Sequence, residues 1–130
     1  MSKKQQLKGE GLAPPSGPFS QGIKTGRFVF VAGQVAVDGQ GRTVGVGDIG
    51  AQTRQALKNV GAVLEAGGAT FDDVVKVTVF VTDLANLQDL QAVRPEFFKQ
   101  PYPASTLVKV AQLINPEWLV EIEAIARVDR

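Results

Sequence analysis

Apolar residues in the middle of the chain recur at helical spacing. Between residues 48 and 66 they fall every three or four positions, which predicts an α-helix with one apolar face, and Asp48 is placed to cap its N-terminus. A second helix is expected from Thr82 or Asp83 onward, and Pro95 should kink it or divide it in two. Its apolar positions are Leu84, Leu87, Leu90, Phe97 and Phe98.

Elsewhere apolar residues alternate with polar ones, which is the spacing of β-strands. Such segments are residues 22–37, with a turn at Gly26, and residues 74–81, 105–110 and 119–128. The order is therefore strands, helix, strand, helix and two strands. This order predicts an α+β fold in which both helices pack on one face of a single mixed sheet.

Alternation within the strands also predicts which side chains meet the helices. One face carries Val120, Ile122, Ala124, Ala126 and Val128 in the last strand, and Val75, Val77, Val79 and Val81 in the strand at 74–81. The opposite face mixes charged residues with Phe80, Leu107, Leu119 and Ile125. The same count places Ser105 and Glu121 together on that opposite face. An apolar patch of this kind is typical of an interface, so we expect an oligomer; the alternative is a monomer with amphipathic strands.

The composition narrows the chemistry that such a fold can carry. The chain has 14 Lys and Arg against 13 Asp and Glu, and it has no His and no Cys. Catalytic triads that use His, Cys/His zinc sites and redox thiols are thereby excluded, and we expect no metal and no cofactor. The net charge of +1 argues against a nucleic-acid partner. No apolar run approaches the roughly 20 residues of a membrane span, so we expect a cytoplasmic protein without a membrane partner.

One domain over residues 1–130 is expected, because that length is typical of a single core. Residues 1–17 are rich in Gly and Pro and predict an irregular lead-in, with at most a short edge strand near Gln5. The G-x-G-x-x-G sequence at Gly45–Gly50 matches a dinucleotide-binding pattern, but Asp48 would oppose a pyrophosphate there. We interpret it as a turn that leads into the helix cap.

Two carboxylates are the strongest catalytic candidates. Glu121 and Glu123 lie two apart in a predicted strand and therefore side by side on one face. Their mutual repulsion can raise one pKa toward the range useful for proton transfer. The alternative is that both are solvated or paired with Lys76, Lys109 or Arg127. Tyr102 and Trp118 flank the last two strands and are interpreted as packing residues.

Several ordered motifs resemble those of the Rid family, also called the YjgF or L-PSP endoribonuclease-like family. They are Ser16–Gly22, Val31–Val35, Gln52–Val60, Val77–Leu84, Phe97-Phe98, Pro103–Thr106 and Val120–Ala126. The resemblance covers nearly the whole chain from residue 16. It implies a chorismate-mutase-like arrangement that assembles as a homotrimer, with small-molecule clefts between subunits.

The resemblance also implies an activity, the hydrolysis of reactive enamines and imines such as 2-aminoacrylate and 2-iminopropanoate to a 2-oxo acid and ammonia. The family Glu that positions or activates the attacking water matches Glu121. The positions implied to bind substrate are Phe19, Ala32, Gly33, Gln91 and Ser105. At four of them the residue differs from the family pattern: Phe19 stands for Tyr, Ala32 for Ser, Gln91 for Asn and Ser105 for Arg.

The change at Ser105 is the most consequential, because the family Arg holds the substrate carboxylate in a bidentate fork. The resemblance therefore predicts inefficient turnover of 2-imino acids, with Arg94 or Lys109 as the cations that could compensate. The alternative function is a trimeric protein that binds a small metabolite or an interaction partner without chemistry. An endoribonuclease or translation inhibitor, suggested by older family names, fits the near-neutral charge less well.

Overall fold

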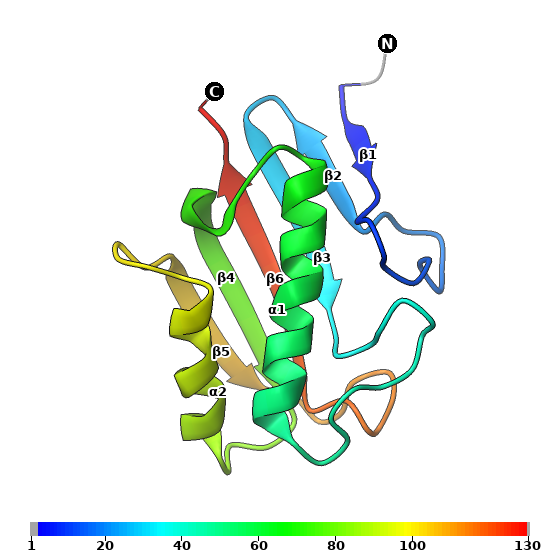
Figure 1. Cartoon of the computed structure of the whole chain (residues 1–130), viewed down its shortest axis with the longest axis vertical. Helices are drawn as coiled ribbons and strands as arrows, with labels where there is room; N and C mark the ends of the chain where they lie inside the picture. Colours follow the sequence, from blue (N-terminus) through cyan, green and yellow to red (C-terminus); the bar gives the residue numbers. More distant parts are fainter. Residues whose placement is uncertain (1–2, 130) are drawn as a thin grey trace.

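The computed structural model describes residues 3–129 and contains one mixed sheet with two helices on one face (Figure 1). The strands are β1 (Gln5–Leu7), β2 (Gly22–Thr25), β3 (Phe28–Gln34), β4 (Val74–Val81), β5 (Ala104–Lys109) and β6 (Val120–Arg127). The helices are α1 (Ile49–Ala66) and α2 (Leu87–Val93), with short 3-10 turns η1 (Phe71–Asp73) and η2 (Arg94–Glu96). The predicted α+β class is confirmed.

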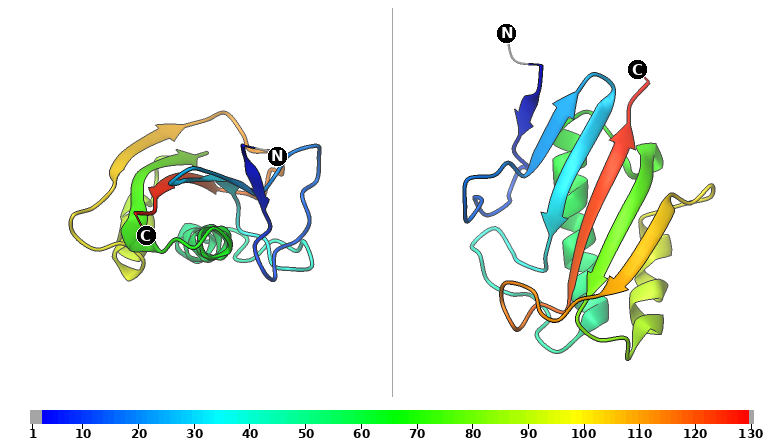
Figure 2. Two further views of the ribbon diagram at one scale, coloured as in Figure 1. Left: turned by 90° about the horizontal axis from the view of Figure 1, so that it is seen from above. Right: turned by 180° about the vertical axis from the view of Figure 1, so that it is seen from behind.

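The strand order is β1-β2-β3-β6-β4-β5, and only β4 and β5 pair in parallel. The connection between these two strands runs through α2, which therefore lies on the same face as α1 (Figure 2). Seen from above, the helices form one layer and the strands the other, and the second sheet face is left open. Within residues 3–129 no helix is long and apolar enough to cross a membrane.

The core lies between α1 and the middle of the sheet. The face of β6 from Val120 to Val128 is buried as predicted, against Leu57, Val60 and Leu64 of α1. A buried amide links this core to the loops near β6. The Gln52 side chain donates to the Glu117 carbonyl (2.9 Å) and accepts from the Leu119 amide (2.8 Å). It thereby fixes the segment that enters β6.

The helix boundaries follow the sequence except at the start of α2. Asp48 caps α1 by accepting from the Ala51 amide (3.0 Å), as predicted. The second helix does divide near Pro95, but it begins at Leu87 and not at Thr82 or Asp83. The Asp83 carboxylate accepts from the Ala85 amide in a local turn, and Asn86 is left-handed with φ 61°, so no helix forms before Leu87.

Three predicted face assignments are wrong. Val75 is exposed because a register shift between Val74 and Lys76 places Val74 in the core instead. Leu119 precedes β6 and packs against the core. Leu107 also packs against the core, because β5 pairs with β4 in a parallel register that aligns Leu107 with buried Val79.

The same register corrects the prediction for Ser105. Ser105 aligns with Val77, whose side chain is buried under the helices, whereas Glu121 aligns with Phe80 on the open face. The two residues therefore lie on opposite faces of the sheet. The apolar part of the open face is made by Phe28, Phe30, Phe80, Val108 and Ile125.

Candidate functional site

Glu121 lies at the start of β6, on the open face, and is half-buried. Burial raises the pKa of its carboxyl above the usual value, and the negative charge of Glu123 raises it further. In the part of the chain that the structure describes, no hydrogen bond or ion pair to this carboxylate is found. Its oxygens are therefore open to a ligand or a water molecule.

Gly33 lies directly against this carboxylate. A Cβ built on Gly33 would overlap the Glu121 carboxylate, so only glycine leaves room for the acid in its present position. Gly33 lies where the pairing of β3 with β6 shifts register between Val31 and Gln34. This bulge brings the backbone of β3 over the Glu121 side chain. The structure thus brings together two of the residues that the resemblance named, Glu121 and Gly33.

Two shallow pockets flank this pair. One of about 230 Å³ contains Phe19, Gly33 and Trp118, and another of about 280 Å³ contains Ala32 with Phe30 and Glu123. Trp118 was interpreted only as a packing residue. Its indole N–H donates to the Thr43 hydroxyl (3.1 Å), and its side chain also lines the Phe19 pocket. We call Glu121, Gly33, Phe19 and Ala32 the acid half-site.

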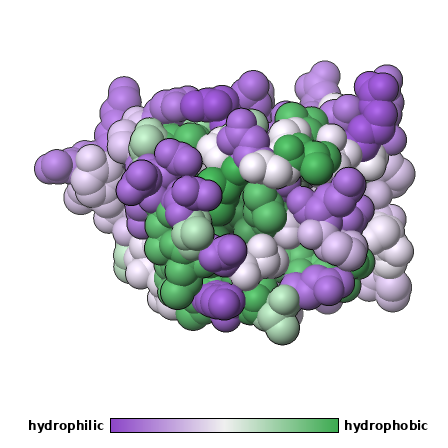
Figure 3. Space-filling view, turned by 90° about the horizontal axis from the view of Figure 1, so that it is seen from below, coloured by the Kyte–Doolittle hydropathy of each residue, from purple (hydrophilic) through white to green (hydrophobic). Residues whose placement is uncertain are grey.

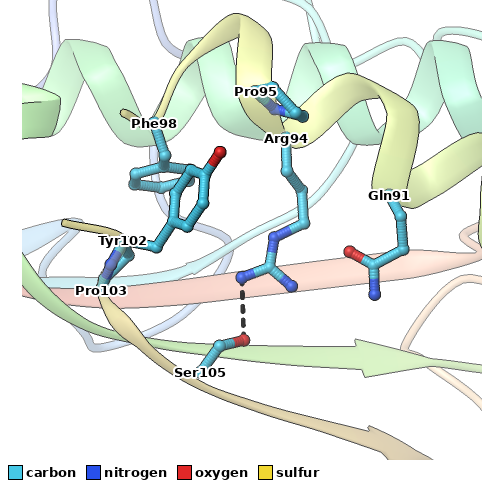
Figure 4. Close-up of a pocket in the computed structure, with 7 residues that line it drawn as sticks. All are labelled: Gln91, Arg94, Pro95, Phe98, Tyr102, Pro103 and Ser105. Carbon is cyan, nitrogen blue, oxygen red and sulfur yellow. Dashed lines mark hydrogen bonds between the residues drawn. The ribbon is translucent and has the colours of Figure 1, made fainter. Parts of the chain in front are cut away.

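Gln91 and Ser105 lie elsewhere, in a third pocket of about 330 Å³ between the α2–η2 segment and the start of β5. We call it the arginine pocket, and it is lined by Gln91, Arg94, Pro95, Phe98, Tyr102, Pro103 and Ser105 (Figure 4). Arg94 extends from the helix layer toward the strand, and its Nη2 donates to the Ser105 Oγ (2.8 Å). The sequence signalled Arg94 only as a possible substitute cation, and Tyr102 only as packing.

The Arg94 guanidinium has no acidic partner among residues 3–129. Glu96, two positions further on, is already occupied, because Arg54 donates to both of its oxygens at 2.9 and 2.7 Å. Burial lowers the pKa of Arg94, but a guanidinium remains protonated in neutral water. The arginine pocket therefore carries an uncompensated positive charge.

The predicted site residues thus form two groups on opposite faces of the sheet, and one chain does not bring them together. Within the described residues, no group of three or more acidic side chains is placed to hold a metal ion. Outside these pockets, the loops expose the apolar side chains of Val46, Leu84 and Ile114. None of these three belongs to the predicted site. The end of the molecule viewed in Figure 3 likewise shows hydrophobic surface between hydrophilic side chains.

Comparison with known proteins gives consistent matches. The family described as Endoribonuclease L-PSP matches residues 10–128. A RutC family protein of Pyrococcus horikoshii is 44% identical over 117 residues, which are 90% of this chain and 92% of the relative. A 2-iminobutanoate/2-iminopropanoate deaminase of Salmonella typhimurium is 42% identical over 113 residues, or 85% of this chain and 87% of the relative.

Solved structures agree with this relationship. The YjgF gene product of E. coli has a TM-score of 0.87 at 37% identity, covering 97% of this chain and 99% of that one. E. coli TdcF with bound serine also has a TM-score of 0.87, at 35% identity, covering 95% of this chain and 98% of the other. The resemblance seen in the sequence motifs therefore extends to the complete fold.

Proposed function

We propose, on the premise that the chain belongs to the Endoribonuclease L-PSP or Rid family, that it hydrolyses small imines of 2-oxo acids. The reaction converts 2-iminopropanoate and water to pyruvate and ammonia. Relatives from Salmonella typhimurium, Dermatophagoides farinae and Homo sapiens carry the name 2-iminobutanoate/2-iminopropanoate deaminase, at 42%, 38% and 34% identity. The single observation that carries the proposal here is the state of Glu121.

Glu121 has the properties of a general base for water. Its pKa is raised by burial, its carboxylate has no protein partner among residues 3–129, and Gly33 leaves space beside it. In the proposed reaction the water oxygen bonds to the imine carbon while Glu121 accepts a water proton. This proton passes to the nitrogen and gives a carbinolamine. Glu121 then transfers the proton of the new hydroxyl group to the amino nitrogen, the carbon–nitrogen bond breaks, and the carbonyl of the 2-oxo acid forms as ammonia leaves. No metal or cofactor takes part in these steps.

The proposed substrate cleft lies between subunits of a homotrimer. Two features support this arrangement. The open sheet face exposes Phe28, Phe30 and Val108 at 41%, 42% and 38%, which is an unusual amount of apolar surface for a monomer. The acid half-site and the arginine pocket also lie on opposite faces, so each is incomplete within one chain. Packing open faces together would enclose the acid half-site between subunits, and contact with the edge strand β5 of a neighbouring subunit would bring its arginine pocket to the same interface.

Replacing Glu121 tests the hydrolysis directly. 2-Iminopropanoate generated in situ should decay faster with wild-type protein than in buffer, and Glu121→Gln should lose roughly a hundredfold or more of that rate. Glu65→Gln is the matched control, because it removes an exposed carboxylate on α1 and leaves Glu121 and the neighbouring charge of Glu123 in place. Imine decay that is no faster than in buffer contradicts the proposed activity, as does a fully active Glu121→Gln.

The alternative, a trimeric protein that binds a small metabolite without chemistry, is favoured by one observation. Ser105 stands where the family motif carries Arg, so this position of β5 offers no cation to a substrate carboxylate. The same assay separates the two functions, since a pure binding protein would bind pyruvate and leave the imine unchanged. Sedimentation as a 13.8 kDa species would contradict the trimer in either case.

A further inference from the structure

The arginine pocket contains a charge whose stabilising partner is missing. Arg94 is half-buried and donates one hydrogen bond, to the neutral hydroxyl of Ser105, although a guanidinium carries five N–H donors. Removing a cation from water has a free-energy cost that a single neutral hydrogen bond does not offset. The remaining donors therefore favour an anion that binds from outside the described chain.

Neighbouring charges do not satisfy this need. The Glu96 carboxylate, the acid nearest to Arg94 in sequence, accepts two hydrogen bonds from Arg54 on α1. This pair holds Glu96 toward α1 and leaves the guanidinium of Arg94 directed toward β5 instead. The ion pair thus preserves the positive charge of the pocket.

The shape of the pocket restricts the anion to a small one. Its volume of about 330 Å³ is at the lower end of the range for small-molecule sites. Figure 4 shows the Gln91 amide extending from the helix in the same direction as Arg94, with Ser105 below and the Tyr102 ring to one side. A planar carboxylate that accepts two parallel N–H bonds from the guanidinium suits this arrangement.

We propose that Arg94 binds the carboxylate of a small 2-oxo or 2-imino acid, and that Ser105 is a positioning residue that holds the guanidinium toward the ligand. The cation is thereby supplied from η2 in the helix layer, where the family motif would supply it from β5. The choice of ligand rests on the proposed function, whereas the presence of an anion site rests on the geometry of the pocket alone.

Binding of pyruvate, measured by calorimetry or NMR titration, tests this proposal without catalysis. Pyruvamide, a neutral ligand of nearly the same shape, is the matched comparison. Wild-type protein should prefer pyruvate, and Arg94→Gln should weaken pyruvate binding by roughly tenfold to a hundredfold while leaving pyruvamide unchanged. Arg94→Lys keeps the charge without the planar fork and should fall between the two.

Arg27→Gln is the control for charge, because Arg27 is exposed and paired with Asp129, outside the residues that line the pocket. It should bind pyruvate as the wild type does. The double variant Arg94→Gln with Ser105→Arg returns the guanidinium to β5 and should recover most of the lost affinity. Thermal unfolding of each variant verifies that the fold is retained.

Equal pyruvate affinity in wild type and Arg94→Gln overturns the proposal, and so does a wild type that does not bind pyruvate. The outcome is separable from that of the proposed hydrolysis. If pyruvate binding depends on Arg94 but the imine does not decay faster than in buffer, the anion site is supported and the proposed hydrolysis is contradicted. If the imine is hydrolysed with the same KM by wild type and Arg94→Gln, the proposed hydrolysis is supported and the proposed role of Arg94 is contradicted.

Discussion

The acid half-site and the arginine pocket carry opposite charges, and each lacks a partner of opposite charge among residues 3–129. Glu121 is a half-buried acid without a protein donor, and Arg94 is a half-buried cation without a protein acid, in each case among residues 3–129. One lies on the open face of the sheet and the other between the helices and the edge strand. Each charged group therefore lacks a partner of opposite charge among the described residues of its own chain.

The two regions also differ in how firmly they are built. Glu121 follows a segment fixed by the buried Gln52, and Gly33 shapes the space beside its carboxylate. Arg94 belongs to a short 3-10 turn, and one hydrogen bond to the exposed Ser105 holds its side chain. Core residues therefore position the Glu121 carboxylate, whereas surface residues position the Arg94 guanidinium. Changes in the core should disturb the first region and spare the second.

Gly33→Ala should have the largest effect on activity. The added Cβ would push the Glu121 carboxylate aside, and a displacement of about 1 Å in a catalytic group can lower the rate by roughly a hundredfold. The acid is the flexible end of a side chain, so the melting temperature should change little. Gly50→Ala is the control, since its Cβ would meet only ordinary contacts. Retained imine hydrolysis in Gly33→Ala would contradict the role given to this contact.

Gln52→Leu should have the largest effect on stability. It removes the amide that bonds to Glu117 and Leu119 and leaves their partly buried backbone groups unpaired, at a cost of about 2 to 3 kcal/mol. Chemical denaturation measures the loss. The entry into β6 should shift and lower imine hydrolysis, while pyruvate binding at Arg94 is retained in the folded protein. Equal losses at both regions would show that they are not independently supported.

The stability of wild type relative to Glu121→Gln should depend on pH. The pKa of Glu121 is higher in the folded chain than in the unfolded one, so the folded state binds the proton more tightly. Wild type therefore loses stability as pH rises through the unfolded-state and folded-state pKa values of Glu121. At pH 7, Glu121→Gln should melt at a higher temperature than wild type. Below about pH 4 the difference should disappear, because the carboxyl is then protonated in both states. Melting curves across this range that stay parallel would contradict the raised pKa.

Ser105→Ala should have the smallest effect. It removes one hydrogen bond, made by the exposed hydroxyl of Ser105, and leaves the guanidinium in place, so pyruvate affinity should fall only about two- to fivefold. Thr106→Ala, on the next residue but the opposite face of β5, is the matched control and should bind as wild type does. A loss as large as that of Arg94→Gln would mean that Ser105 itself contacts the ligand.

Much of the fold could be predicted from the sequence because its signals are local. The spacing of apolar residues in α1, the Asp48 cap and the buried face of β6 each depend on neighbours within a few positions. The acid was found in the same way, since alternation alone places Glu121 on the open face.

The arginine pocket could not be predicted, because it depends on pairing between distant segments. Whether Ser105 faces the helices or the open side is set by the parallel register of β5 against β4, and no residue within β5 encodes that alignment. The contact between Arg94 and Ser105 joins a 3-10 turn to a strand beyond a loop. The left-handed Asn86 and the register shift near Val75 were likewise invisible to a regular period.

The position of β5 at the edge of the sheet has a consequence for local opening. It bonds to β4 on one side only, and all of its residues except Leu107 are exposed, so its amides should exchange with deuterium sooner than those of β6. Each local opening of β5 would break the hydrogen bond between Arg94 and Ser105 and disrupt the arginine pocket. A carboxylate ligand that holds the closed form should therefore slow exchange along β5, far beyond the atoms that it touches.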